Sequence, residues 1–241
     1  MPSHPLLLAL VALVASTLAA VTGFGGAAVL LPALVSAFGV REAIPILTVA
    51  QLIGNASRVW FNRQSLDYRV VAWFALGGVP TALLGGYLFA HAPLTALTRA
   101  LGIFLLLVVL WRHLHPSPPG KFPVQVFAGI GAGASFLSAL LGSVGPLMAP
   151  FFLAYGLIKS AYIGTEALST VVMHVTKLFA YRQTAVLTHF GMLAGLALGP
   201  IMILGSFLGK KIVDKLPEKV FVLLIEAVLI AAGLLFLVRG R

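Results

Sequence analysis

The sequence predicts an all-α integral membrane protein, and three observations support that class. Of the 241 residues, 60% are hydrophobic and only 9% are charged, whereas a soluble domain has about 25% charged residues. Mean hydropathy is +1.07, and the apolar residues form long runs separated by short polar or glycine-rich breaks. So few charged side chains cannot cover a soluble fold, and a disordered chain has far fewer apolar residues.

Ten apolar segments follow one another along the chain. A helix that crosses the hydrocarbon core needs about 20 residues, which predicts membrane segments over 5–21, 25–39, 43–62, 70–90, 94–112, 123–141, 145–157, 161–181, 187–208 and 219–238. The second and seventh segments are short, and each follows a glycine-rich stretch. We expect both to be short helices, or helices broken near the midplane of the membrane.

The two halves of the chain resemble one another. A polar, proline-rich linker over 113–122 separates a first repeat, 1–112, from a second repeat, 123–241. Equivalent residues keep a slowly drifting offset: 118 for Pro32 and Pro150, 119 for Asn55 and His174 and for Arg58 and Lys177, and 120 for Pro80 and Pro200. Such a drift is typical of an old duplication with single-residue insertions.

Charge patterning predicts the orientation of the segments. Net charge is +10, and the basic residues lie in short loops, as membrane orientation requires, so we expect no nucleic-acid partner. With ten crossings and an outside N-terminus, nine Lys and Arg residues fall in cytoplasmic loops and five outside; with segments two and seven re-entrant, the count is seven against seven. The first arrangement fits the positive-inside rule and makes the linker cytoplasmic. Because five is odd, the repeats are then inverted.

The sequence gives no sign of a cofactor, a metal site or a catalytic group. The chain contains no cysteine, which excludes disulfides, thiol catalysis and thiolate metal sites. It contains no Gly-x-x-x-x-Gly-Lys-Ser/Thr motif for binding ATP. We therefore expect a protein that is not an enzyme and that uses ion or substrate gradients.

The two glycine-rich breaks are the first candidate site. A helix that begins inside the membrane after such a break has unpaired N–H groups and the positive end of its dipole at that point, which suits an anion. Broken helices in matching positions of two halves indicate a transporter's binding site, whereas close helix packing is the alternative explanation for the glycines. The candidates are Gly23, Gly25 and Gly26, and Gly142, Ser143 and Gly145.

Two polar stripes are the second candidate site. Residues spaced by three or four positions share one helix face, and polar groups in a membrane face a partner or a water-filled path. The stripes are Thr48, Gln51, Asn55, Arg58 and Asn62 on segment three, and Glu166, Thr170, His174, Lys177 and Tyr181 on segment eight.

Each polar residue of the stripes receives an expected role. Gln51, Asn55, Thr170 and His174 are expected to hydrogen-bond an anion, with Arg58 and Lys177 attracting it at opposite mouths. Alternatively, the two cations extend to the membrane surface. Glu166 and His174 are candidates for proton coupling, and Glu166 alternatively pairs with a donor on a neighbouring helix.

Several motifs together resemble the TauE/SafE sulfite exporter family. They are Thr22-Gly23-Phe24-Gly25-Gly26 leading to Pro32, Ser138-Ala139-Leu140-Leu141-Gly142 leading to Pro150, and Gly164-Thr165-Glu166-Ala167 with Met173-His174-Val175-Thr176-Lys177. The resemblance implies a bacterial inner-membrane transporter of sulfur-containing anions such as sulfite. Ser143 and Val144 stand where that family tends to have glycine, so the second half is expected to bind substrate differently.

The sequence thus predicts a multi-pass secondary transporter that exports sulfite or an organosulfonate by alternating access. Its expected partners are a small anion and the lipid bilayer; the sequence does not indicate an oligomeric state. One alternative is a proton- or cation-coupled transporter that uses Glu166 and His174. The other is an intramembrane enzyme with Ser138 or Ser143 as nucleophile and His174 or Glu166 as base.

Overall fold

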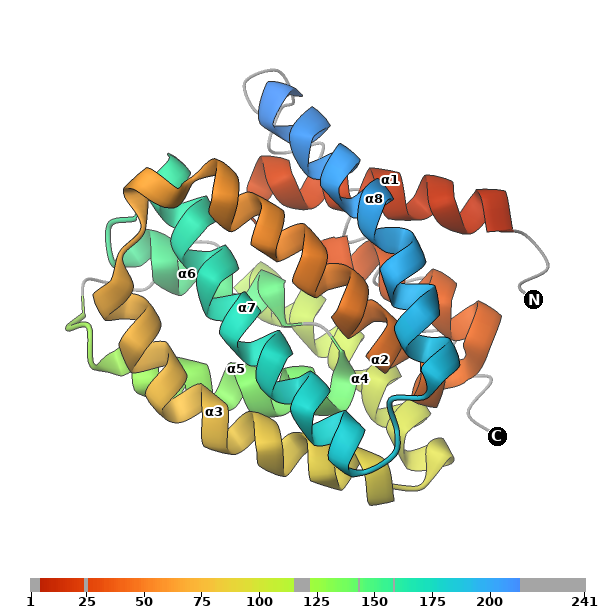
Figure 1. Ribbon diagram of the computed structural model, residues 1–241. Helices are drawn as coiled ribbons and strands as arrows, with labels where there is room; N and C mark the ends of the chain where they lie inside the picture. The colour runs from red at the N-terminus through yellow and green to blue at the C-terminus, as the bar shows by residue number, and fades with distance from the viewer. Residues whose placement is uncertain (1–4, 24–25, 115–121, 143, 158, 213–241) are drawn as a thin grey trace.

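All regular structure in the described part of the chain is helical (Figure 1). The computed structural model describes residues 5–23, 26–114, 122–142, 144–157 and 159–212. Within these ranges the helices are α1 (Pro5–Thr22), α2 (Gly26–Phe61), the short 3₁₀ helix η1 (Arg63–Ser65), α3 (Tyr68–His91), α4 (Leu94–Leu114), α5 (Val126–Leu141), α6 (Gly145–Ala154), α7 (Lys159–Gln183) and α8 (His189–Ile212).

The helices match nine of the ten predicted segments to within a few residues. Segments two and three both lie within α2, and a kink at Gly39, where φ is 75° and ψ is 165°, interrupts the helical geometry between them. The tenth segment, 219–238, lies outside the described residues, as do Gly25, Ser143 and most of the predicted linker. Of the described helices, three are long and apolar enough to cross a membrane by themselves: α2, α3 and most of α8.

The predicted shortness of segments two and seven is confirmed. α6 has 10 residues, and a helix of that length extends about 15 Å, half of the roughly 30 Å hydrocarbon core. The part of α2 before the kink, residues 26–38, extends about 20 Å by the same arithmetic. The count of ten full crossings is therefore not confirmed, and it stays a prediction together with the inverted repeat.

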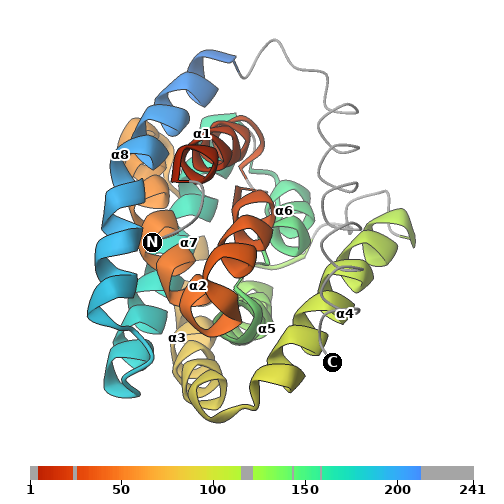
Figure 2. The ribbon, with the colours of Figure 1, turned by 90° about the vertical axis from the view of Figure 1, so that its right-hand side faces the viewer.

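The main pairs of packed helices each join one half of the chain to the other, and each pair has a counterpart. α1 packs against α8, and α3 packs against α5; if the halves are exchanged, either pair becomes the other. In the same way, contacts of α2 with α8 correspond to contacts of α7 with α3. α2 and α7, which carry the polar stripes, contact one another at the centre, and α4 lies at one edge (Figure 2).

The molecule is apolar outside and polar inside. Large apolar side chains are exposed on most of the helices, among them Leu10, Leu76, Leu107, Phe179 and Leu193. Buried groups include Arg58, Glu166, His174 and Lys177, each at most 5% exposed. A protein in water shows the reverse distribution, whereas ionisable groups of a membrane protein face its interior. This is why α7, the most polar helix, lies inside.

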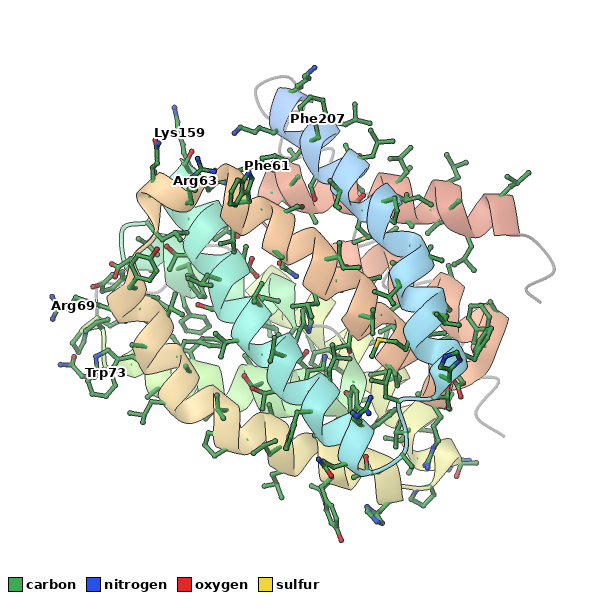
Figure 3. The ribbon with its side chains drawn as sticks, viewed as in Figure 1. Phe61, Arg63, Arg69, Trp73, Lys159 and Phe207 are labelled. Carbon is green, nitrogen blue, oxygen red and sulfur yellow. The ribbon has the colours of Figure 1, made fainter. Side chains whose placement is uncertain are left out.

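Basic residues gather at one end of the helix bundle, which we call the basic end. α2 ends there, α3 and α7 begin there, and Figure 3 shows Arg63, Arg69 and Lys159 on that side. Lys210, near the end of α8, joins them by donating a hydrogen bond to the Phe61 carbonyl (3.3 Å). The positive-inside rule predicts that the basic end is cytoplasmic.

At the opposite end of the bundle, the basic side chain of Arg41 is hydrogen-bonded within the protein. Arg41 follows the kink of α2, and its guanidinium donates to the Ala90 and Ala92 carbonyls at the end of α3. Its neighbour Glu42 accepts a hydrogen bond from Thr188 (3.1 Å). These contacts hold the kink of α2 against the end of α3 and the start of α8.

Candidate functional site

The two glycine-rich breaks have the same backbone geometry. α1 ends before Gly23 and α5 ends before Gly142, where φ is 80° and 86°. Each glycine N–H donates to a carbonyl four residues earlier, that of Ala19 (2.9 Å) or Ser138 (2.8 Å). Glycine in this left-handed conformation is the ordinary end of an α-helix. Positions 23 and 142, like 19 and 138, differ by 119.

A small cavity of about 40 Å³ lies between the breaks. By the usual requirement of about 10–15 Å³ for one water molecule, it has room for about three waters. The first residues of α2 and α6 form part of its wall, so two helix N-termini meet there. The lining residues are Ala19, Gly23, Gly26, Ala27, Gln51, Asn55, Arg58, Ser138, Gly142, Val144, Gly145, Met148, Glu166, Thr170, Met173 and His174.

Most of the predicted site residues meet at this cavity. From the breaks come Gly23, Gly26, Gly142 and Gly145, and from the stripes come Gln51, Asn55, Arg58, Glu166, Thr170 and His174. Lys177 does not line it. Sequence reasoning did not propose Ala19 and Ser138 as binding residues, although their position one turn before each break is a usable signal. Met173 belongs to a motif quoted above but was not proposed as a binding residue, and nothing in the sequence marks Met148.

Arg58 is buried and fully engaged inside the protein. It is 5% exposed, and its Nη1 donates to the carbonyls of Ala19 and Gly23, both at 3.0 Å. Its Nη2 donates to Asn55 Oδ1, and Glu166 Oε2 lies 4.0 Å from Nη1. The alternative that Arg58 extends to the membrane surface is therefore wrong, whereas pairing of Glu166 with a donor on a neighbouring helix is confirmed.

Lys177 occupies the equivalent place in the second half. It is fully buried, and its ammonium donates to Ser138 Oγ at the end of α5 (3.0 Å); it does not extend to the surface either. Both cations thus lie at the C-terminal end of a broken helix, where exposed carbonyls and the helix dipole favour positive charge. Arg58 contacts the carbonyls at the end of α1 directly, whereas Lys177 contacts a hydroxyl at the end of α5.

Three polar atoms in the cavity wall have no hydrogen-bond partner among the described residues. They are Gln51 Nε2, His174 Nδ1 and Glu166 Oε2, on residues that are at most 4% exposed. Leaving such a buried group unpaired costs about 1–3 kcal/mol. The other carboxylate oxygen of Glu166 accepts from Thr170 (3.1 Å). The cavity therefore offers one free amide donor, one free imidazole nitrogen and one free carboxylate oxygen.

The described residues contain no cluster of three or more His, Asp or Glu side chains that could hold a metal ion. Ser138 Oγ bonds to Lys177, and neither His174 nor Glu166 bonds to it in the described part of the chain. In the described part of the chain, therefore, no hydrogen bond joins Ser138 to either base that the enzyme hypothesis paired with it, although all three residues line the cavity. Ser143 lies outside the described residues.

An apolar exterior, two polar central helices and a cavity between helix breaks define a multi-pass membrane transporter. The chain belongs to the sulfite exporter TauE/SafE family, whose model matches residues 8–236; the resemblance seen in the sequence is confirmed. A similar protein is the probable membrane transporter protein YunE of Bacillus subtilis (strain 168), which is 22% identical over 268 residues and is covered, like this chain, to 97%. No solved structure matches the chain. The protein is thus a multi-pass membrane transporter of the bacterial inner-membrane type.

Proposed function

We propose that the chain is a secondary transporter that exports a small sulfur-containing oxyanion, sulfite or an organosulfonate, by alternating access. The observation that carries the proposal is the cavity wall, where the N-termini of α2 and α6 meet beside an unpaired amide donor, Gln51 Nε2. An oxyanion accepts hydrogen bonds and carries negative charge, so it satisfies both features at once. The export direction rests on the family.

Charge balance around the cavity supports an anion held by backbone dipoles. The Arg58 guanidinium faces Glu166 and two backbone carbonyls, and Lys177 does not line the cavity. A strongly cationic pocket would hold an anion too tightly for release, because transport requires binding that is weak enough to reverse. Partial charges at two helix ends provide that moderate attraction.

Cavity size favours sulfite over larger organosulfonates. Room for about three waters in about 40 Å³ fits an anion of a few heavy atoms. An organosulfonate with a carbon chain requires the cavity to widen. Sulfite is therefore the first substrate to test.

Alternating access is supported by the exchange of partners between the halves. Because α1 on α8 and α3 on α5 are equivalent pairs, a movement that opens one end of the bundle has a counterpart at the other end. Inverted repeats provide such a pair of states. A monovalent anion that leaves a negative-inside cell gains about 2.3 kcal/mol per 100 mV, so export without a coupled ion is feasible.

A second candidate, proton- or cation-coupled transport, rests on Glu166. Its Oε2 lies in the cavity wall without a hydrogen bond and 4.0 Å from Arg58. A proton on this carboxylate would weaken its attraction for Arg58 and free the guanidinium for the anion. In that case anion and proton move together, and a pH gradient changes the rate.

The test is uptake of radiolabelled sulfite into liposomes that contain the purified chain, under an imposed membrane potential. Sulfate, chloride and an organosulfonate serve as competitors. Gln51→Leu removes the free donor and is expected to lower flux at least tenfold, by the loss of a hydrogen bond to a charged group, about 1.5–3 kcal/mol.

The matched control is Gln125→Leu, which makes the same change at an exposed position before α5 and should leave flux unchanged. Potential-dependent flux that is lost in Gln51→Leu alone supports the proposal. No sulfite flux and no competitor effect would reject sulfite as the substrate, whereas flux that requires a pH gradient would favour the proton-coupled candidate.

A further inference from the structure

Two adjoining hollows lie at the basic end of the bundle. Their volumes are about 480 and 350 Å³, and both are lined by Phe61, Asn62, Ser160 and Lys210, so they form one space that we call the basic vestibule. It lies between the end of α2, the start of α7 and the end of α8. Figure 3 shows Phe61, Arg63 and Lys159 together on this side.

The charge of the vestibule has one sign among its described lining residues. Arg63, Lys159 and Lys210 line it, and no Asp or Glu does so in the described part of the chain. A concave surface with low-dielectric walls and one sign of charge concentrates ions of the opposite sign. The backbone of Lys159 has φ of 48°, a left-handed conformation that is uncommon for a residue with a side chain.

A single layer of residues separates the vestibule from the central cavity. Arg58 lines both spaces, and Tyr162 lines the vestibule. The Tyr162 hydroxyl donates to the Thr22 carbonyl (3.1 Å), and its ring covers Gly23: a Cβ on that glycine would come within 2.5–2.7 Å of the ring atoms and the hydroxyl. The layer thus consists of Tyr162 and Arg58 resting on the end of α1.

We propose that the basic vestibule is an entry site for small anions and that Tyr162 is the gate between this site and the central cavity. The lysines and Arg63 concentrate the anion, and movement of the Tyr162 ring, which donates to the Thr22 carbonyl and packs against Phe152, connects the vestibule to the cavity. Because Arg58 lines both spaces, its guanidinium can contact the anion in the vestibule and in the cavity. The nature of the transported anion rests on the proposed function, whereas the gate and the charge of the vestibule do not.

Absence of cysteine from the chain allows a direct test with single cysteines. Ser160→Cys reports on the vestibule, where Ser160 is exposed, and Ala27→Cys reports on the central cavity. Membrane-impermeant methanethiosulfonates, one with a sulfonate and one with a quaternary ammonium, are added to vesicles of either orientation. The orientation in which Ser160→Cys reacts identifies the accessible basic end.

We expect the sulfonate reagent to react with Ser160→Cys about tenfold faster than the ammonium reagent, after each rate is divided by its rate with a free thiol. Replacing Lys159 and Lys210 by Gln should bring this ratio close to one. A ratio near one in the parent, or one unchanged by the two replacements, would overturn the entry site.

For the gate, Ala27→Cys should react slowly from the basic end in the parent, and about tenfold or more faster with Tyr162→Ala. Tyr162→Phe, which removes only the hydroxyl, should lie between them. The matched control is Tyr87→Ala, since Tyr87 is 56% exposed on α3 and lies outside the lining of both spaces; it should change nothing.

Two results would overturn the gate: rapid labelling of Ala27→Cys with Tyr162 in place, or no acceleration in Tyr162→Ala while Ser160→Cys in the same variant still reacts and so reports a folded vestibule. Labelling requires no transport. If the gate behaves as expected and sulfite flux is absent, the proposed substrate fails and the gate stands.

Discussion

The two helix breaks have the same backbone conformation but differ in the side chains around them. At each, a glycine with positive φ ends a helix and a cation 35 residues further along the chain (positions 23 and 58, 142 and 177) lies against that helix end. At the first break the cation is Arg58, which bonds to backbone carbonyls, faces Glu166 and lines the cavity. At the second it is Lys177, which does not line the cavity itself and donates to the hydroxyl of Ser138, a residue of the cavity wall.

The two helix ends have the same backbone geometry, but among the described residues an ion pair is present only at the first, between Arg58 and Glu166. Arg58 can exchange among carbonyls, a carboxylate and an anion, because its guanidinium presents five donors in a fixed plane. Among the described side chains, the acceptor of Lys177 is Ser138, and this bond connects α7 to α5. We therefore expect the first break to act in transport and the second to act in stability.

The largest expected effect is on stability and follows Arg58→Leu. This change leaves Glu166 buried without its cation, and breaking a buried ion pair costs about 3–5 kcal/mol. The free energy of unfolding in detergent, from denaturant titration, should fall by that amount. Arg63→Leu, at an exposed position, is the matched control and should change it by less than about 0.5 kcal/mol.

The free energy of unfolding of Lys177→Met, measured in the same way, tests whether the two buried cations differ in their contribution to stability. Lys177 has no carboxylate partner among the described residues, so the loss is its hydrogen bond to Ser138, offset by removal of a buried charge. We expect less than half the loss of Arg58→Leu. Equal losses would mean that the two cations contribute equally to stability, which would contradict the proposed difference between the breaks.

Replacing Gly23 and Gly142 by alanine should reveal a further difference between the two breaks. Both substitutions force a side chain into the left-handed region, at about 1–2 kcal/mol. Gly23→Ala also drives a Cβ into the Tyr162 ring, whereas at Gly142 the nearest atoms, on Leu31 and Ile44, are 3.3 Å away. Gly23→Ala should therefore lower the melting temperature in detergent more than Gly142→Ala, and the reverse order would contradict the described contact.

Glu166→Gln tests which ion the first break serves. Gln keeps the shape and removes the charge, so an anion path should retain flux to within about threefold of the parent, a change of less than 0.7 kcal/mol. Any acceleration of flux by an imposed pH gradient should disappear. Complete loss of flux would instead support the cation-coupled candidate.

The smallest expected effect follows Tyr181→Phe near the second break. The Tyr181 hydroxyl donates to the Ala139 carbonyl (2.6 Å), and a hydrogen bond of this kind contributes about 0.5–1.5 kcal/mol. The unfolding free energy should fall by about that amount while sulfite flux stays unchanged. A loss of flux without a loss of stability would place function at the second break as well.

Helix positions could be predicted closely because they follow from local hydrophobicity. The predicted segment 70–90 corresponds to Tyr68–His91, and 161–181 corresponds to Lys159–Gln183. The predicted boundary between segments two and three coincides with the non-helical backbone at Gly39. The direction of the kink there could not be predicted, because local hydrophobicity locates helices and does not give the angle between them.

The class of protein, the two breaks and the two polar faces could be predicted from the sequence, because spacing along a helix places side chains on one face whatever surrounds it. What each polar group contacts depends on the packing of the helices in three dimensions. Arg58 and Lys177 are equivalent in sequence, yet a carboxylate lies near one and a hydroxyl near the other. Tyr162 lies four residues before Glu166, on the face of the segment-eight stripe, but this spacing does not reveal that its side chain reaches Thr22 across 140 residues. Such contacts depend on how helices pack against one another, which local hydrophobicity does not specify.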